Sequence, residues 1–311
     1  MKKKVVSLLA AMALAVTALA GCGSNNAATT GTDAATVAAT TEAAGTTEAA
    51  GTTEAATDSE AVTGVKAGFI FLHDENSTYD LNFLNAAKAA CEKLGIEYMT
   101  KTNIPEGQEA YEAACELADA GCNFIFADSF GHEDYIIEAA KEYPDVQFCH
   151  ATGYQASSAG LANFHNYFGR IYEARYLSGI VAGLKAKEIG NNVLGYVAAM
   201  PFAEVISGFT AFYLGAKSVN PDVTMKVMYT DSWNDPTKEA QNANALIDAG
   251  CGVISQHCDS TAPATAAEEK GAFHVGYNSG MIDVAPNASL TSAIWDWSQY
   301  LVYATTCVAK G

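Results

Sequence analysis

Val65-Lys66-Ala67-Gly68-Phe69-Ile70-Phe71-Leu72 is the stretch of this 311-residue chain that decides the fold. It is short and almost continuously hydrophobic, and such runs are typical of strands that are buried on both faces of a parallel sheet. Hydrophobic residues then recur at helical spacing from Leu81 to Leu94, and Gly95 is placed to end that helix. A buried strand followed by an amphipathic helix is the repeating unit of an α/β protein.

The same alternation continues along the chain and restarts after a long helical segment, 167–187. Repeated βα units imply parallel sheets with helices on both faces, joined by right-handed crossovers. We therefore predict an α/β fold with a first lobe over 64–187, a second lobe over 188–278, a cleft between them, and a return segment to the first lobe over 279–311. The expected strands are 65–72, 96–101, 123–127, 146–151, 193–199, 224–230, 253–257 and 273–277, and the expected helices are 81–94, 108–120, 135–142, 204–218, 237–249 and 262–270.

The N-terminal region, 1–21, has the features of an export signal. Three lysines precede a hydrophobic run that is too short to span a membrane as a helix. The next residues, Leu19-Ala20-Gly21-Cys22, resemble the lipobox of bacterial lipoproteins, in which the cysteine becomes the lipidated N-terminus. An ordinary signal peptide with a chance cysteine is the alternative. Residues 22–63 are built on Thr-Thr-Glu-Ala-Ala-Gly repeats without a hydrophobic stripe, so we expect a disordered tether.

Composition argues against several classes of protein. Lys and Arg number 17 against 35 Asp and Glu, a net charge of -18, which disfavours binding to nucleic acid polymers. Beside Cys22 there are seven cysteines in no regular spacing, and we interpret them as mostly buried free thiols. The six histidines form no closely spaced pair that would predict a metal site, and there is no nucleophile elbow or phosphate-binding loop. We expect no metal, no cofactor and no enzymatic activity.

The loops that follow the expected strands are the candidate binding loops, because ligands of open α/β sheets bind at the carboxyl ends of the strands. These loops are rich in aromatic side chains, carboxylates and amides. Aromatic faces stack on planar rings and carboxylates accept hydrogen bonds from N–H or O–H groups, so a neutral planar or hydroxylated ligand is predicted. The loops are 73–80, 128–132, 150–154, 200–204, 231–235, 258–260 and 278–281.

Six segments of the chain carry a resemblance to a known family. They are 143–148 (YPDVQF), 150–154 (HATGY), 167–177 (YFGRIYEARYL), 195–199 (GYVAA), 219–222 (VNPD) and 256–260 (QHCDS). Together they resemble the basic membrane protein family of ABC-transporter substrate-binding lipoproteins, over about 65–310. The resemblance implies a two-lobed, type I periplasmic-binding fold that delivers purine nucleosides or purine bases to a membrane permease. It also implies that the chain is truncated at its C-terminal end, since relatives continue for several more elements.

The resemblance also implies ligand-binding residues. Trp233 matches an aromatic residue that packs on the purine in relatives, and Asp259 follows the Gln-His pair. Tyr79 has packing between the lobes as its alternative role, and Asp128 and Asp259 have helix capping as theirs. The full implied set is Tyr79, Asp80, Asn82, Asp128, Ser129, Phe130, Trp233, Asp235, Asp259, Asn278 and Trp295.

Two departures bear on the ligand. The nucleoside-binding branch usually has an Asp-x-Ser-Phe-Asn pattern in the first loop, where this chain has 74–80 (DENSTYD), and Trp295 lies near a position where relatives place a lysine. Both favour a free base or another heterocycle over a nucleoside. The expected function is that of a monomeric, lipid-anchored, extracytoplasmic receptor that captures a purine base or nucleoside by lobe closure for an ABC permease. A sugar receptor of the same fold and a sensory receptor are the alternatives.

Overall fold

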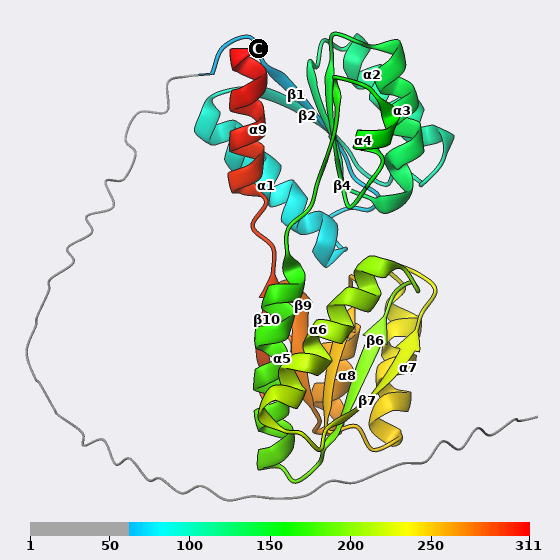
Figure 1. Ribbon diagram of the computed structural model, residues 1–311, viewed down its shortest axis with the longest axis vertical. Coiled ribbons are helices and arrows are strands. Elements are labelled where there is room, and N and C mark those ends of the chain that lie inside the picture. The colour runs from blue at the N-terminus through cyan, green and yellow to red at the C-terminus, as the bar shows by residue number, and fades with distance from the viewer. Residues whose placement is uncertain (1–61) are drawn as a thin grey trace, which may run out of the picture. The chain divides into compact units, whose positions relative to one another are not determined.

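The computed structural model describes residues 62–311, which form two α/β lobes, each with a five-stranded parallel sheet (Figure 1). The predicted fold class is confirmed. Cys22, the expected signal peptide and nearly all of the expected tether lie outside the described residues. The first lobe contains β1 (Lys66–Ile70), α1 (Thr78–Leu94), β2 (Glu97–Lys101), α2 (Gln108–Asp119), β3 (Phe124–Ala127), the 3-10 helix η1 (Phe130–His132), α3 (Glu133–Glu142), β4 (Gln147–Ala151), α4 (Ala156–Ala159) and β5 (Phe164–Tyr167).

The second lobe follows, and the last helix returns to the first lobe. Figure 1 shows α9 beside α1, against which it packs. The second lobe contains α5 (Ile171–Glu188), β6 (Val193–Ala198), α6 (Ala203–Val219), β7 (Thr224–Tyr229), α7 (Pro236–Asp248), β8 (Val253–His257), α8 (Ala262–Lys270), β9 (Phe273–Asn278) and β10 (Ser289–Ile294), and α9 is Ser298–Lys310.

The observed lobe boundaries differ from the sequence-based ones in two places. The segment 167–187, assigned to the first lobe, contains the end of β5 and then α5, which packs along α6 of the second lobe. The return segment begins later than 279, because β10 pairs with β9 in the second sheet. The chain therefore passes between the lobes at 168–170 and again at 295–297.

The two sheets have the same topology. Their strand orders are β2-β1-β3-β4-β5 and β10-β9-β8-β6-β7, which is one order when each lobe is numbered from its own first strand. In sheets of this order the connections run in opposite directions on either side of one point, which lies between β1 and β3 in the first lobe and between β6 and β8 in the second. The loops at such a point separate and leave a crevice in which ligands bind.

The sheet interiors are built from the hydrophobic runs that predicted them. Phe69, Phe124 and Phe126 are buried in the first lobe, and Tyr196 and Phe212 are buried in the second. The seven cysteines among the described residues are free, and five of them are buried, which confirms the interpretation of mostly buried thiols. Burial raises the pKa of the Cys91 and Cys149 thiols to about 12, so these thiols are un-ionised at neutral pH.

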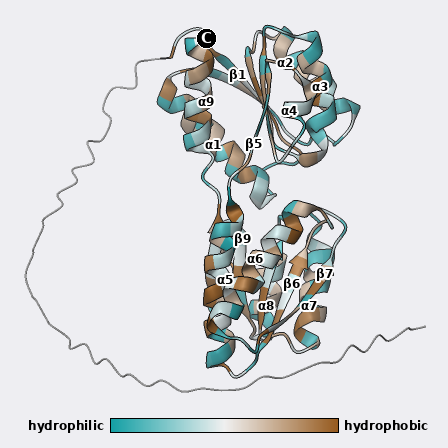
Figure 2. Cartoon of the chain, in the orientation of Figure 1, coloured by the Kyte–Doolittle hydropathy of each residue, from teal (hydrophilic) through white to brown (hydrophobic). Residues whose placement is uncertain are grey.

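Helix α5 exposes several hydrophobic side chains, and Figure 2 shows hydrophobic residues along its length. Tyr172, Leu177 and Leu184 lie on its solvent-facing side with 44%, 63% and 52% of their surfaces exposed. Within 62–311, no helix combines the length and the hydrophobicity that crossing a membrane requires.

Close packing of α5 on α6 depends on glycines. A Cβ atom at Gly179 would lie 2.0 Å from the carbonyl oxygen of Phe212, and one at Gly215 would lie 2.0 Å from the carbonyl oxygen of Tyr176. Because the atoms in the way are backbone atoms, the helices themselves would have to move apart. The two glycines therefore set the distance between the helices that cover one face of the second sheet.

We predict that Gly179→Ala lowers the free energy of unfolding by about 1–3 kcal/mol, because overpacking outweighs the gain of about 1 kcal/mol that alanine brings to a helix. Urea unfolding of the purified protein measures the change. Gly280→Ala is the control, since a Cβ there meets nothing within 4 Å, and its unfolding free energy should stay within about 0.5 kcal/mol of wild type. Equal stability of the Gly179→Ala variant would contradict this account of the helix contact.

Candidate functional site

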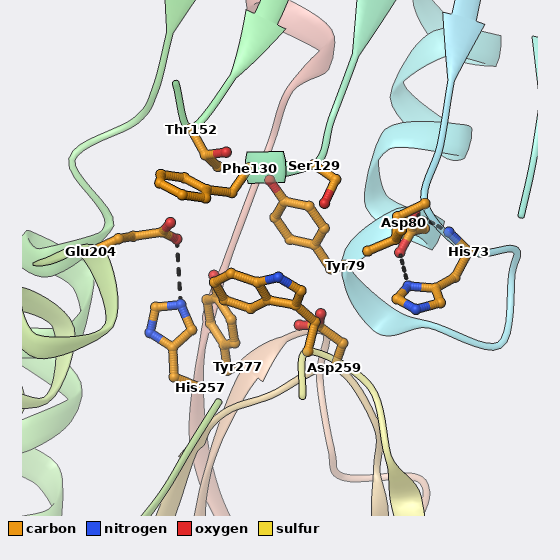
Figure 3. A pocket seen from close by; sticks show the side chains of 12 residues that line it. His73, Tyr79, Asp80, Ser129, Phe130, Thr152, Glu204, His257, Asp259 and Tyr277 are labelled. Atoms are coloured by element: carbon orange, nitrogen blue, oxygen red, sulfur yellow. Dashed lines mark hydrogen bonds and ion pairs between the residues drawn. The ribbon is translucent and has the colours of Figure 1, made fainter. Parts of the chain in front are cut away.

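The candidate site is a pocket formed where the loops of the two lobes meet (Figure 3). It lies beside the carboxyl ends of β1 and β3 in the first lobe and of β6 and β8 in the second, at the points where each sheet reverses its connections. The space between the lining side chains is about 360 Å³, but the centre of a water molecule fits in only about 20 Å³ of it. A ligand of several atoms therefore enters when the walls move apart. The lining residues are Leu72, His73, Tyr79, Asp80, Ser129, Phe130, Thr152, Glu204, Trp233, His257, Asp259 and Tyr277.

Aromatic side chains from both lobes form the walls of the pocket. Phe130 of the first lobe stacks on Phe202 of the second, with ring centroids 5.0 Å apart and an angle of 28° between the planes. Phe202 in turn lies 5.9 Å from Trp233, which lines the pocket together with Tyr79 and Tyr277. Flat aromatic walls of this kind favour a planar ligand.

Hydrogen bonds join the two lobes directly beneath the pocket. The backbone N–H and the hydroxyl of Thr78 both donate to the carbonyl oxygen of Asp259, at 2.8 and 3.0 Å. The Asn82 amide donates to the carbonyl oxygen of Asn278 at 2.6 Å. The Asn278 amide donates to Thr78 Oγ1 at 3.3 Å and to Asp259 Oδ1 at 2.9 Å, from a backbone with a φ of 67°. These hydrogen bonds hold the start of α1 against the residues that follow β8 and against the end of β9.

Asp80 is a buried carboxylate whose hydrogen-bonding capacity is used inside the first lobe. Its Oδ1 accepts from the His73 backbone N–H at 2.9 Å, and its Oδ2 accepts from the Ser77 hydroxyl at 2.6 Å and lies 3.2 Å from His73 Nδ1. Burial opposes ionisation, but these hydrogen bonds outweigh it and lower the pKa of Asp80. Asp80 is therefore an ionised carboxylate that organises the first loop.

Asp128 is fully buried behind the pocket and lacks a partner for one oxygen. Its Oδ1 accepts from the Leu72 N–H at 3.2 Å, and its backbone carbonyl accepts from the Tyr79 hydroxyl at 3.0 Å, while Oδ2 has no hydrogen bond among the described residues. Burial, with the neighbouring Asp80 carboxylate as the next cause, raises the pKa of Asp128 well above its usual value. Of the two carboxyl groups, Asp128 is therefore the one that holds its proton to the higher pH.

Glu204 and His257 face each other on the other side of the pocket, as Figure 3 shows. Glu204 Oε1 lies 3.4 Å from His257 Nε2. Burial raises the pKa of Glu204 to about 7, with Arg175 acting in the opposite direction. Burial, and then the Arg175 charge, lower the pKa of His257 well below its usual value, so this imidazole is neutral. The second lobe thus presents a carboxyl group that ionises near neutral pH.

Thr152 lines the pocket with a strained backbone. Its φ is 64°, which is rare for a β-branched residue, and its buried hydroxyl has no partner among the described residues. The loop is held by the buried carboxylate of Glu133, whose Oε1 accepts from the N–H groups of Tyr154 and Gln155 at 2.8 Å each. Strain combined with an unpaired polar group is a feature of binding sites, where the surrounding structure maintains it.

Six of the eleven ligand-binding residues expected from the sequence line the pocket. They are Tyr79, Asp80, Ser129, Phe130, Trp233 and Asp259, and they come from both lobes. Three of them also have the structural contacts described above, since the Tyr79 hydroxyl donates to the backbone, Asp80 accepts from His73 and Ser77, and Asp259 accepts from Asn278.

The other five lie outside the lining, each with a structural contact. Asn82 and Asn278 belong to the hydrogen bonds between the lobes, and Asp128 lies behind the pocket wall. Asp235 caps α7, because its side chain accepts from the Lys238 N–H. Trp295 lies at the second crossing between lobes, stacked on Trp297 at 4.3 Å and donating to the Tyr277 hydroxyl at 3.2 Å.

Sequence reasoning did not single out the remaining lining residues. His73, Thr152 and Glu204 lie in loops that were expected to bind, but no residue type marked them within those loops. His257 and Tyr277 lie at the ends of β8 and β9, where only the observed strand register tells which side chain faces the pocket. The lining residues missed are Leu72, His73, Thr152, Glu204, His257 and Tyr277.

Comparison with known proteins connects this geometry to a family. The Bmp family model, described as ABC transporter substrate-binding protein PnrA-like, matches residues 71–311. A purine-binding protein of Brucella abortus is 39% identical over 252 residues, which cover 79% of this chain and 69% of that protein. A putative ABC transporter glucose-binding protein of Haloferax volcanii is 40% identical over 207 residues, which cover 67% of this chain and 50% of that protein.

Among solved structures, an ABC transporter solute-binding protein from Conexibacter woesei has the same fold. It superposes with a TM-score of 0.66 at 20% identity and covers 80% of this chain and 82% of that one. At that identity the likeness concerns the fold alone.

The buried Asp128 predicts a pH-dependent stability. A group whose pKa is raised by folding destabilises the folded state as pH rises above its unfolded-state pKa of about 4, because ionisation is harder in the folded protein. Asp128→Asn should therefore raise the free energy of unfolding at pH 7, with a gain that vanishes towards pH 4. Urea unfolding between pH 4 and 8 measures it. The exposed control Asp222→Asn should show no such trend, and a gain that is constant with pH would argue against ionisation of Asp128 as its source.

Proposed function

Because this chain belongs to the Bmp family of PnrA-like ABC transporter substrate-binding proteins, we propose that it captures a purine base outside the cytoplasmic membrane and presents it to an ABC permease. The observation that carries the proposal is the aromatic pocket between the lobes, with carboxyl groups at its edges. Aromatic faces stack on a purine ring, at about 1–3 kcal/mol per base, while carboxyl and hydroxyl groups bond to its polar edge. The purine-binding relative in Brucella abortus supports the same ligand class.

The polar contacts of the first loop favour a free base over a nucleoside. A ribose needs carboxylate or amide groups with free acceptors, and the obvious candidate in this loop is Asp80. Both of its oxygens already accept hydrogen bonds from His73 and Ser77. Asp74, at the start of the same loop, accepts from Asn76 and is engaged there. The departure of this loop from the nucleoside-binding pattern is consistent with that arrangement.

A sugar is the second candidate ligand, since one relative is a putative glucose-binding protein. Sugars present several hydroxyl groups around their rim and are commonly bound by clusters of charged and amide side chains. The pocket lining has three carboxyl side chains but no arginine, lysine, asparagine or glutamine, and four of its twelve members are Tyr, Phe or Trp. The aromatic walls support a flat ligand.

Capture would proceed by movement of the lobes about the two segments that connect them. Phe168 of the first segment packs on Trp295 of the second, with ring centroids 5.0 Å apart. Rotation about these segments would break the Phe130–Phe202 stack and the bonds of Thr78 to Asp259, and would widen the narrow pocket. Binding of the ligand would then favour the closed arrangement of the lobes. The surface of the closed arrangement differs from that of the open one, so a permease can distinguish the two.

The proposal includes a lipid anchor at Cys22 and a monomeric receptor at the outer face of the membrane. The lipobox-like sequence and the Thr-Glu-Ala repeats that follow it support an anchor with a tether. A tether of this kind keeps the receptor near its permease and leaves it free to dock and release.

A thermal-shift screen of the purified protein against purine bases, nucleosides and sugars tests the ligand class. A base at one hundred times its dissociation constant should stabilise the protein by about 2.7 kcal/mol. Trp233→Ala should weaken the binding of that base at least tenfold, Trp233→Phe should weaken it less, and Tyr303→Ala, a change at an exposed tyrosine of α9, should leave it unchanged. Stabilisation by sugars alone would refute the purine proposal.

The anchor is tested by Cys22→Ser in the full-length chain. Without the thiol that would be lipidated, the protein should move from the membrane fraction to the soluble fraction or the medium, and metabolic labelling with a fatty acid should be lost. Cys307→Ser, which removes an exposed cysteine of the second half, is the control and should leave both unchanged. A Cys22→Ser protein that stays labelled would show that lipidation occurs elsewhere.

A further inference from the structure

Glu204 lines the pocket with a carboxyl group that the rest of the protein engages little. It lies in the first turn of α6, and its carboxyl group points into the pocket (Figure 3). Oε1 lies 3.4 Å from His257 Nε2, and neither oxygen accepts a hydrogen bond from any other described residue. The side chain is 16% exposed, so the pocket is its remaining contact with water. A ligand in the pocket therefore meets a carboxyl group with free hydrogen-bonding positions.

The charge nearest Glu204 is held in place by other contacts. Arg175 is buried beneath the pocket, and its Nη1 donates to the Tyr196 hydroxyl at 2.5 Å and to the Gln256 carbonyl at 3.0 Å. Its guanidinium also lies over the Tyr277 ring, 3.9 Å from the centroid. Among residues 62–311 it forms no ion pair with Glu204 within 4.0 Å. Glu204 is therefore not fixed as one half of a structural salt bridge.

The local backbone is shaped to bring these groups together. Gly208 follows Glu204 by one helical turn on the same face of α6. A Cβ at Gly208 would lie 3.0 Å from Arg175 Cδ and Nε and 3.2 Å from His257 Nδ1. The missing side chain lets Arg175 and His257 reach the space under Glu204, and His257 then orients one oxygen of its carboxyl group while the other remains free.

On the basis of the proposed function, we propose that Glu204, as a neutral carboxylic acid, forms hydrogen bonds with the polar edge of the ligand. In this form it selects a purine that offers one hydrogen-bond donor beside one acceptor. A neutral carboxylic acid presents an O–H donor and a C=O acceptor side by side. That pair matches the ring nitrogen and amino group of adenine, or the N–H and carbonyl of hypoxanthine. Guanine offers the same N–H and carbonyl as hypoxanthine, but it alone of the three also has two adjacent donors, its N–H and its amino group, which the two acceptors of an ionised carboxylate would match. Ionisation of Glu204 should therefore weaken the binding of adenine and hypoxanthine relative to that of guanine.

Burial decides which form is present in the complex. It raises the pKa of Glu204 to about 7, against the pull of Arg175, and the positive end of α6 also favours the ion but acts weakly beside burial. Ligand entry removes the water that still reaches the side chain, which favours the neutral form further. Binding of a mixed-edge purine should therefore take up a proton, and its affinity should fall as pH rises through 7.

Several other titratable groups face Glu204. Arg175 of α5 stays charged, and His257 of β8 is neutral because burial lowers its pKa. Tyr79, Tyr196 and Tyr277 are neutral, since burial raises the pKa of each. The remaining group is Asp259, whose pKa burial also raises, so a variant of Glu204 itself is needed to isolate its contribution to the pH dependence.

The test measures the affinity of the purified protein for adenine, hypoxanthine and guanine between pH 6 and 8, by titration and by competition. The adenine affinity of wild type should fall about tenfold from pH 6 to pH 8, as ionisation of a group with a pKa of about 7 requires, whereas its guanine affinity should not fall. Glu204→Gln keeps a donor beside an acceptor and should bind adenine without this pH dependence. Glu204→Ala should bind adenine more weakly than wild type at pH 6, and the exposed Glu112→Gln should behave as wild type.

Three outcomes would overturn the inference alone: an adenine affinity that does not fall between pH 6 and pH 8, an unchanged adenine affinity in Glu204→Ala at pH 6, or an unchanged pH dependence in Glu204→Gln. In each of these cases purines still bind, so the proposed function stands. Failure of all three bases to bind wild type would instead refute the proposed function and this inference with it. Circular dichroism of each variant distinguishes lost recognition from lost folding.

Discussion

The carbonyl oxygen of Asp259 is the point on which the arrangement of the two lobes depends. It accepts hydrogen bonds from both the backbone N–H and the hydroxyl of Thr78, across the boundary between the lobes. Asn82 and Asn278 add two more bonds beside it. A protein hydrogen bond contributes about 0.5–1.5 kcal/mol net, so these four bonds hold the lobes together without locking them. A few weak hydrogen bonds between the lobes suit a receptor that must open to exchange its ligand.

The shared topology of the lobes explains why these hydrogen bonds lie next to the pocket. Each sheet reverses its connections between its first and third strands, and the loops that separate there carry the lining residues. Two crevices facing one another make one pocket with a wall from each lobe. The first lobe contributes Asp80 and Phe130, and the second contributes Glu204 and Trp233. Neither lobe alone could surround a ligand, so recognition requires that both be in place.

The sequence predicted most elements because their hydrophobic patterns are strong, and it missed those whose patterns are weak. The strand 253–257 and the helix 262–270 were predicted with the observed bounds. β5 was not predicted, and only its last residue was assigned to the following helix, because Phe164-His165-Asn166-Tyr167 is a short, half-polar edge strand. β10 also lies at a sheet edge, and its residues are mostly half-buried, so no hydrophobic run marked it. Edge strands lack the two-sided burial from which parallel strands are recognised.

The site was predictable to the level of loops and less so to the level of residues. The rule that ligands bind at the carboxyl ends of strands found the right loops, because chain connectivity alone implies it. Which side chain turns inward depends on register and on single backbone angles, as with His257 at the end of β8 and Thr152 at a φ of 64°. Trp295 illustrates the limit, since its position in the chain suggested a ligand contact while its indole packs over Gly169 at a crossing between the lobes.

Buried polar atoms that lack a hydrogen-bond partner are concentrated around this pocket, and hydrophobic packing alone would not produce that concentration. Six of the eleven such atoms among residues 62–311 belong to residues that line the pocket or lie directly beside or beneath it: Thr152 Oγ1, His257 Nδ1, Asp128 Oδ2, Asn278 Oδ1, and Nε and Nη2 of Arg175. Each unpaired buried group costs about 1–3 kcal/mol, and apolar residues of similar size would avoid that cost. Selection for stability alone would remove such groups, whereas a ligand that bonds to some of them recovers part of the cost on binding. Their concentration around one pocket therefore argues that the folded state is organised for a bound partner.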